Sequence, residues 1–318
     1  MRFRGGDHHV QSALSRLSIV NLPLLALVSF AIITACARAE GENFGNFRPL
    51  DVVALVGGED MVAAADFGYF EYLVVKAWPD YHIKFRGIAK EGDTAFEQAR
   101  DFNYPALDQQ LDEMGATVAL LQVGQMESLR GASGMADFEK ELEKLVERVS
   151  GGGKRRVILI GPTPLSPSSS AAGRFGALKS YGEAVRRMAR RKELACVLPG
   201  ELAAGDYRDG LHLNERGQFG FAMQLAHALA GVKRKDESTN RDERRLLELI
   251  QSKNQLWFNY LRPQNWAFLD GDRTVQPASR DHLDPEKRWF PEEMKAWLPL
   301  IGARETEIWA LARQLGSK

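Results

Sequence analysis

A carboxylate precedes a histidine by three residues in the segment 209–214, which reads Asp-Gly-Leu-His-Leu-Asn. In a glycine-containing loop that enters a helix, Asp209 can orient the imidazole of His212. The imidazole can then act as a general base toward an attacking hydroxyl. This chemistry also requires a nucleophile and hydrogen-bond donors for the charge that develops on oxygen. The nucleophile and the donors must therefore come from other segments of the chain.

Three other short segments combine glycine with polar or acidic residues, and each follows an apolar run. They are 57–59 (Gly-Gly-Glu), 91–94 (Glu-Gly-Asp-Thr) and 124–128 (Gly-Gln-Met-Glu-Ser). In an open parallel sheet, ligands bind beyond the carboxyl ends of the strands, where such loops meet. We therefore expect the three segments to lie beside Asp209 and His212.

The elements that position these loops alternate between strand and helix patterns. Apolar runs predict strands over 51–56, 82–86, 118–123, 157–160 and 194–198. Apolar residues at helical spacing predict helices over 67–78, 104–114, 138–149, 178–191 and 218–230. Short connections between alternating elements predict a flavodoxin-like, three-layer α/β/α domain with a five-stranded parallel sheet.

The composition limits the classes of partner. Among 318 residues, Lys and Arg number 42 and Asp and Glu also number 42, so the formal net charge is zero. No nucleic-acid partner is expected at that balance. The two cysteines, Cys36 and Cys196, have no CxxC-type spacing, and the histidines have no second ligand at metal-binding spacing. We therefore predict no structural metal and no cofactor, and the sequence does not predict an oligomeric state.

Residues 1–39 have the pattern of an export signal. Basic residues precede the apolar run 22–35, and Ala-Arg-Ala at 37–39 fits a cleavage site. The segment before Cys36 also resembles a bacterial lipoprotein signal, in which the cysteine is lipidated. The run 17–35 is just long enough to span a bilayer as an uncleaved anchor. The sequence thus predicts a bacterial protein that is periplasmic, secreted or anchored to a membrane.

The C-terminal part differs in amino-acid composition from the sheet domain. Segment 232–245 is rich in charge and poor in apolar residues, which is typical of a linker. Segment 246–318 contains five of the six tryptophans and two helical patterns, and it predicts an aromatic-rich helical extension docked on the sheet domain. One hypothesis is that Trp266, Trp289 and Trp297 form a stacking platform for sugar rings.

The four loops resemble, in order and spacing, four blocks of the SGNH (GDSL-type) hydrolase superfamily over about 50–231. The resemblance implies a hydrolase-like domain at 45–231 that acts on esters of small molecules, carbohydrates or lipids. It also implies that His212 is the general base and that Asp209 orients it. Gly92 would supply a backbone N–H to the oxyanion hole.

The chain departs from the family at two catalytic positions. Glu59 stands where the family has its nucleophilic serine, and Met126 stands where an asparagine completes the oxyanion hole. Gly58 replaces the acidic residue beside the nucleophile. The C-terminal part is similar to a tail of SGNH-like exported proteins of planctomycete and verrucomicrobial type, a subgroup that commonly lacks this serine. The residues that carry this similarity are 254, 256–258 and 262–265.

Three readings follow from these departures. Losing the nucleophile costs roughly 10⁶ in kcat, and losing an oxyanion donor costs on the order of 10²–10³. The protein could be a binding protein on a hydrolase scaffold. Alternatively, Glu59, within hydrogen-bond reach of His212, could activate water or form a covalent intermediate. Thirdly, it could be an ordinary esterase with a different nucleophile, although Thr94 and Ser128, the nearest hydroxyls, lie outside the first turn.

Overall fold

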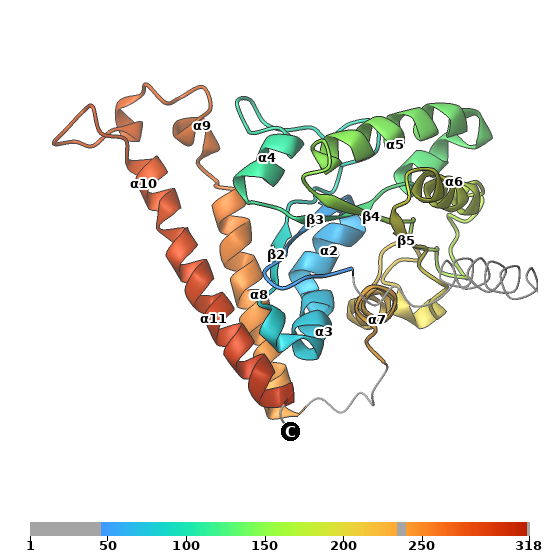
Figure 1. The fold of residues 1–318 in the computed structure, drawn as a ribbon. Helices are drawn as coiled ribbons and strands as arrows, with labels where there is room; N and C mark the ends of the chain where they lie inside the picture. The colour runs from blue at the N-terminus through green and yellow to red at the C-terminus, as the bar shows by residue number, and fades with distance from the viewer. Residues whose placement is uncertain (1–45, 234–239, 317–318) are drawn as a thin grey trace, which may run out of the picture. The chain divides into compact units, whose positions relative to one another are not determined.

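A five-stranded, all-parallel sheet forms the centre of the computed structural model, which describes residues 46–233 and 240–316 (Figure 1). The strands are β1 (Val52–Gly57), β2 (Lys84–Gly87), β3 (Val118–Gln122), β4 (Arg156–Ile160) and β5 (Ala195–Val197). Their order is β2-β1-β3-β4-β5. This is the flavodoxin-like order, and the predicted fold class is confirmed. The export signal predicted at 1–39, including Cys36, lies outside the described residues and stays a prediction.

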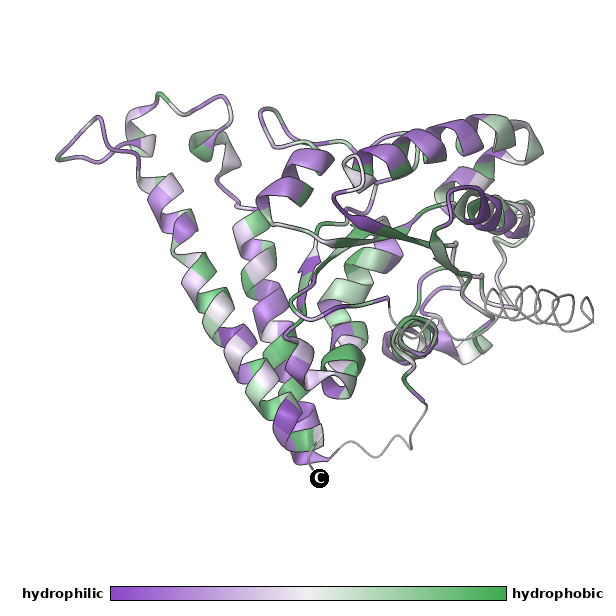
Figure 2. Ribbon diagram, in the orientation of Figure 1, coloured by the Kyte–Doolittle hydropathy of each residue, from purple (hydrophilic) through white to green (hydrophobic). Residues whose placement is uncertain are grey.

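Alternating strand residues divide the interior into two cores. In β1, Val53 and Leu55 belong to one core, whereas Ala54 and Val56 belong to the other. The three central strands, β1, β3 and β4, are largely hydrophobic along their length (Figure 2). Because strand side chains point alternately to the two faces, a sheet covered on both sides needs apolar residues at every position. This explains why the central strands read as nearly continuous apolar runs in the sequence, whereas the edge strand β2 contains Lys84 and Arg86.

Helices cover both faces of the sheet, as Figure 1 shows. One core is covered by α2 (Glu59–Phe67), α3 (Tyr69–Ala77) and α7 (Glu215–Ala230). The other is covered by α4 (Leu107–Glu113), α5 (Met135–Ser150) and α6 (Leu178–Arg191). Five of these helices overlap the predicted ranges. The sequence pattern predicted no helix before Phe67, so α2 is an element that the prediction missed. Its apolar residues are mostly small, which weakens the helical pattern. Gly68, whose backbone lies in the left-handed region, separates α2 from α3.

Short 3₁₀ helices occur in the connections. They are η1 (Pro79–Tyr81), η2 (Met126–Arg130), η3 (Ala132–Gly134), η4 (Ala204–Asp206) and η5 (Pro277–Ser279). None of the helices in the described part of the chain is both long and apolar enough to cross a membrane.

The C-terminal extension is helical and packs on the sheet domain, as predicted. It contains α8 (Arg241–Leu261), α9 (Trp266–Leu269), α10 (Trp289–Lys295) and α11 (Trp297–Gly316). The helices α8 and α11 lie side by side (Figure 1). Helix α8 begins inside the segment predicted as a linker, where Asn240 and Glu243 form a capping box. That local hydrogen bonding extends the helix beyond its apolar pattern.

Two ion pairs are buried where the extension meets the sheet domain. Lys253 Nζ lies 2.8 Å from Glu71 Oε2 and donates to the Phe85 carbonyl oxygen at 3.2 Å. Arg86 Nη1 lies 2.5 Å from Glu305 Oε1. Burial lowers the pKa of Lys253 and raises the pKa of Glu71, because both groups lose hydration when charged. These pairs link α8 to α3 and α11 to β2.

Candidate functional site

The four glycine-containing loops line one open cleft at the carboxyl edge of the sheet. The cleft has a volume of about 410 Å³ and is lined by residues 58–60, 91–94, 122–127 and 211–212. The chain leaves β1 through Gly57, whose φ is +139°. A Cβ built at Gly57 would lie 2.3 Å from the Gln122 carbonyl oxygen. Glycine is required there because β1 and β3 approach closely at the point where the cleft begins.

Asp209 and His212 form the predicted pair. His212 Nδ1 lies 2.7 Å from Asp209 Oδ2, and Asp209 Oδ1 accepts from the backbone N–H of His212 at 2.8 Å and of Leu211 at 3.1 Å. These hydrogen bonds, that of the His212 N–H above all, lower the pKa of Asp209. An ionised Asp209 accepts the Nδ1 proton, so Nε2 is left as the basic atom of the ring.

Local structure fixes the loop that carries this pair. Gly210 has a φ of +82°, and a Cβ there would lie 3.1 Å from Ser169 Oγ. Asn214 caps α7, since its Oδ1 accepts from the Gly217 N–H at 3.1 Å. The Arg208 N–H donates to the His212 carbonyl oxygen at 2.8 Å. The motif 209–214 therefore encodes a tight turn and a helix cap as well as the pair.

Glu59 lines the cleft as the first residue of α2. Within the described residues, no hydrogen bond or ion pair joins Glu59 to His212. The direct contact expected between them is therefore absent. Both side chains face the same cleft, and a ligand or water can lie between them.

Asp60 is a cleft residue that the sequence reasoning missed. It is only 5% exposed, and its Oδ2 accepts a hydrogen bond from Gln122 Nε2 at 3.4 Å. Burial raises the pKa of Asp60; a hydrogen bond with Thr163 and the charge of His212 oppose the rise, and the charge of Glu59 adds to it. An acidic residue in the first turn after a buried strand was the signal available in the sequence.

The predicted oxyanion site is only partly present. Gly92 lines the cleft, a Cβ there would meet nothing within 4 Å, and its N–H has no hydrogen-bond partner among the described residues. Met126 also lines the cleft and is 48% exposed, but its thioether offers no donor. Beside it, Gln125 Nε2 is buried without a partner among the described residues. Gly92 thus supplies a donor and Met126 does not.

Glu127 holds the second and third loops together. Its carboxylate accepts from the Gly124 N–H at 2.8 Å and from the Ala95 N–H at 2.6 Å. Burial raises the pKa of Glu127, whereas these backbone hydrogen bonds oppose the rise. The acidic residue of the third loop therefore has a positioning role.

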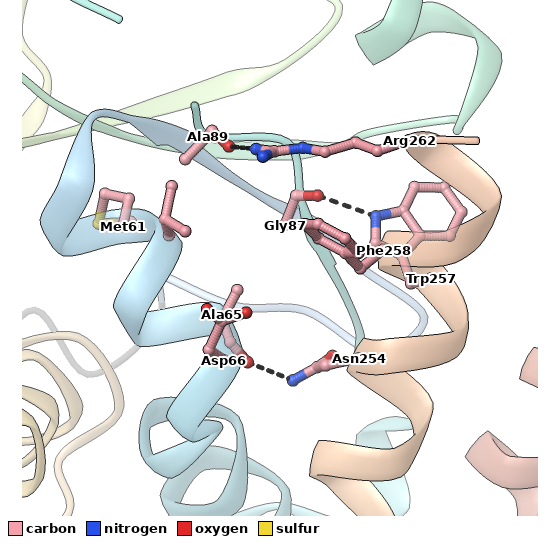
Figure 3. A pocket seen from close by; sticks show the side chains of 10 residues that line it. Met61, Ala65, Asp66, Gly87, Ala89, Asn254, Trp257, Phe258 and Arg262 are labelled. Carbon is pink, nitrogen blue, oxygen red and sulfur yellow. Dashed lines mark hydrogen bonds between the residues drawn. The ribbon is translucent and has the colours of Figure 1, made fainter. Parts of the chain in front are cut away.

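The C-terminal extension holds the strand and loop that lead to Gly92. Trp257 Nε1 donates to the Gly87 carbonyl oxygen at 3.0 Å, and Arg262 Nη2 donates to the Ala89 carbonyl oxygen (Figure 3). Arg262 Nη1 also lies 3.5 Å from Glu91 Oε2. Backbone carbonyl groups at the end of β2 and in the loop after it thus accept hydrogen bonds from Trp257 of α8 and from Arg262, which directly follows α8. We infer that the extension restrains the loop at 89–94.

Arg262→Ala is expected to loosen that loop. A hydrogen bond to a charged group contributes about 1.5–3 kcal/mol, so local opening should increase roughly 10–100-fold. Hydrogen exchange followed by mass spectrometry should show faster exchange at 89–94. Arg313→Ala is the control, because Arg313 pairs with Asp80 at 2.8 Å, at the far end of α11. Equal exchange at 89–94 in both variants would contradict the restraint.

The tryptophans of the extension do not contact one another through their rings in the described structure. The ring of Trp266 packs on Tyr104 at 4.6 Å, and that of Trp289 stacks on His282 at 6.5 Å. Neither Trp266, Trp289 nor Trp297 is fully buried. The three tryptophans are therefore exposed enough to contact a sugar ring, but their rings do not form one continuous platform.

No protein-family model matches the chain, and no curated protein matches its sequence. Solved structures resemble it. A gut microbial diltiazem-metabolizing enzyme has a TM-score of 0.54 at 12% identity, over 85% of this chain and 95% of that chain. An acetylxylan esterase from Geobacillus stearothermophilus has a TM-score of 0.44 at 13% identity, over 58% of this chain and 96% of that chain. A candidate GDSL-like lipase from Parabacteroides merdae has a TM-score of 0.45 at 13% identity, over 60% of this chain and 100% of that chain. At such identities the likeness concerns the fold.

Proposed function

We propose that this chain, which has the fold of the SGNH (GDSL-type) hydrolases, binds an ester in the cleft without forming an acyl-serine intermediate. The ester would be that of a small molecule, carbohydrate or lipid. The supporting observation is the hydroxyl content of the cleft. Of the described residues that line it, only Thr94 carries a hydroxyl. Thr94 Oγ1 bonds Glu97 backbone atoms at 3.2 and 3.4 Å and makes no hydrogen bond with His212.

Other nearby hydroxyls are unsuited to attack. Ser128 is fully buried, and its Oγ donates to the Gln125 carbonyl oxygen at 2.6 Å. Thr163 is fully buried and accepts from Gln122 Nε2 at 3.1 Å. An attacking hydroxyl must lie within hydrogen-bond reach of its base. Neither Ser128 nor Thr163 bonds His212 in the described structure.

The groups that would bind an ester are better preserved than the nucleophile. His212 Nε2 and the Gly92 N–H face the cleft from opposite loops, and both lack a hydrogen-bond partner among the described residues. The Gly92 N–H can donate to the carbonyl oxygen of an ester, and His212 Nε2 can accept a hydrogen bond from a hydroxyl group of the bound molecule or from a water beside it. The geometry thus supports recognition of an ester more strongly than conventional turnover.

The purified protein is expected not to react with a fluorophosphonate probe, because no activated serine faces His212. It is expected to bind some acetylated sugars or short acyl esters, detected by ligand-observed NMR, and His212→Ala should weaken that binding. A covalent adduct mapped by mass spectrometry to any hydroxyl in the cleft would contradict the proposal. The proposal would also be contradicted if none of the esters in such a screen bound to the protein.

The alternative function is an active ester hydrolase that uses a carboxylate. One observation favours it, because Glu59 and Asp60 both line the cleft together with His212. A covalent intermediate on Glu59 would need an unhindered approach of that carboxylate to the acyl carbon. Hydrolysis by water would instead need an acid and a base on the two sides of the ester.

A further inference from the structure

We propose that Asp60 and His212 form an acid–base pair through which water hydrolyses a bound ester directly, without a covalent intermediate. This inference rests on the proposed binding of esters and adds a reaction to it. It assigns the acid to Asp60, whereas the sequence suggested Glu59 as a carboxylate that activates water or forms a covalent intermediate.

The position of Asp60 is fixed by three elements of the sheet domain. It is the second residue of α2 and lies in the floor of the cleft. Gln122, at the end of β3, donates to its carboxylate and also to Thr163, which follows β4. Because Gln122 is itself buried, this contact holds the Asp60 side chain in one place. A carboxyl group held beneath the ligand is suited to proton transfer, since its distance to the ligand is fixed.

The charged environment of Asp60 sets it apart from Asp209. Glu59, His212 and Tyr207 are the titratable groups that face it, and no lysine or arginine pairs with it in the described structure. Burial raises the pKa of Asp60, whereas hydrogen bonds lower the pKa of Asp209. Two carboxyl groups whose pKa values are displaced in opposite directions take different roles in acid–base catalysis. The directions of the two shifts favour Asp60 as the carboxyl group that keeps its proton to higher pH and Asp209 as the ionised support of the base.

The reaction can be written with these groups alone. His212 Nε2 removes a proton from water as the water oxygen forms a bond to the acyl carbon. The Gly92 N–H donates to the resulting oxyanion. The bond to the alcohol oxygen then breaks, and that oxygen takes the proton of Asp60. An acid and an alcohol leave, and the proton on His212 returns to Asp60, so that one ester and one water are consumed.

The test compares Asp60→Asn with Asp66→Asn, a matched change on the same helix but outside the cleft. With acetylated xylobiose as the probe, Asp60→Asn should lower kcat by about 10²-fold or more and leave KM nearly unchanged, because the leaving sugar oxygen needs a proton. With 4-nitrophenyl acetate the loss should be much smaller, because 4-nitrophenolate leaves without one. Asp66→Asn should keep kcat within about twofold of the original chain. The fall of kcat at alkaline pH should also disappear in Asp60→Asn, because that limb reports loss of the Asp60 proton. No acyl-enzyme should appear in quenched samples examined by mass spectrometry.

A second readout does not depend on turnover. A group whose pKa is raised by folding contributes stability below its unfolded pKa, and this is lost as pH rises through the folded pKa. Asp60→Asn removes the group that ionises, so its Tm relative to the original chain should increase as pH rises above about 4, the ordinary pKa of an aspartate. Asp93→Asn, which breaks the 2.8 Å ion pair with Arg100, should lower Tm at pH 8. A pH-independent loss of Tm in Asp60→Asn would overturn the assignment.

The remaining outcomes separate this inference from the proposed function. Binding of the probes without turnover would overturn the acid–base pair and leave ester binding intact. Absence of both would overturn the proposed function as well. A larger loss of kcat from Glu59→Gln than from Asp60→Asn would place the acid on Glu59 and overturn the inference.

Discussion

Lys253→Ala is expected to lower the free energy of unfolding by about 3–5 kcal/mol, the cost of leaving the partner of a buried ion pair without compensation. Lys253 is fully buried, and its only carboxylate partner within the described residues is Glu71, at 2.8 Å. Removing the ammonium group also removes the donor to the Phe85 carbonyl oxygen. The loss can be measured by urea unfolding followed by tryptophan fluorescence, since five of the six tryptophans lie in the extension.

Two further variants show whether the effect comes from the buried charge. Lys253→Met combined with Glu71→Leu should be less damaging than Lys253→Ala alone, because replacing both charges with apolar groups is often neutral or stabilising. Lys144→Ala removes an exposed pair with Glu141 on α5, at 2.8 Å, and should cost only about 0.2–1 kcal/mol. Equal costs for Lys253→Ala and Lys144→Ala would show that the buried pair adds nothing special to the docking of the extension.

Glu59→Ser is expected to create reactivity toward fluorophosphonates. A nucleophile contributes roughly 10⁶ in kcat, and the missing asparagine donor removes on the order of 10²–10³, so a gain of about 10³–10⁴-fold remains. The new hydroxyl would stand at the start of α2, on the cleft that His212 lines. Fluorophosphonate labelling rates measure the gain.

The controls identify the origin of any gain. Glu59→Ala removes the same carboxylate without adding a hydroxyl and should remain unlabelled by fluorophosphonates. Glu59→Ser combined with His212→Ala should lose most of the gain, because the base is removed. If fluorophosphonates label Glu59→Ser no faster than Glu59→Ala, the cleft does not activate a serine at this position. The loops would then lack further groups of a serine hydrolase besides the nucleophile.

Much of the site could be predicted because its chemistry is encoded in short segments. The spacing of Asp209 and His212 within one turn brings carboxylate and imidazole together whatever the rest of the chain does. Glycines mark the loops at the sheet edge because the backbone there approaches its neighbours closely, as Gly57 approaches Gln122. Asp60 could not be predicted in the same way. Its importance comes from burial beside residues of β3 and the loop after β4, which are more than 60 positions away.

Helix boundaries show the same division. The amphipathic pattern of α6 predicts Leu178–Arg191, the range that the structure has. In α2 the pattern is weak, because the helix packs between the sheet and α8 and buries small residues such as Ala64. The start of α8 depends on the capping box at Asn240, a signal that the charge-rich composition of 232–245 concealed.

The sequence by itself determined the parallel α/β sheet, the loops of the cleft and the lack of a hydroxyl at the first turn. Those features depend on residue type and on spacing within one element. Only the tertiary structure decided three features of the described residues. Glu59 makes no hydrogen bond or ion pair with His212, Asp60 is buried without a lysine or arginine partner, and Arg262, directly after α8, holds the loop before Gly92. Each of these depends on groups distant in the sequence, whose burial and charge are set by packing.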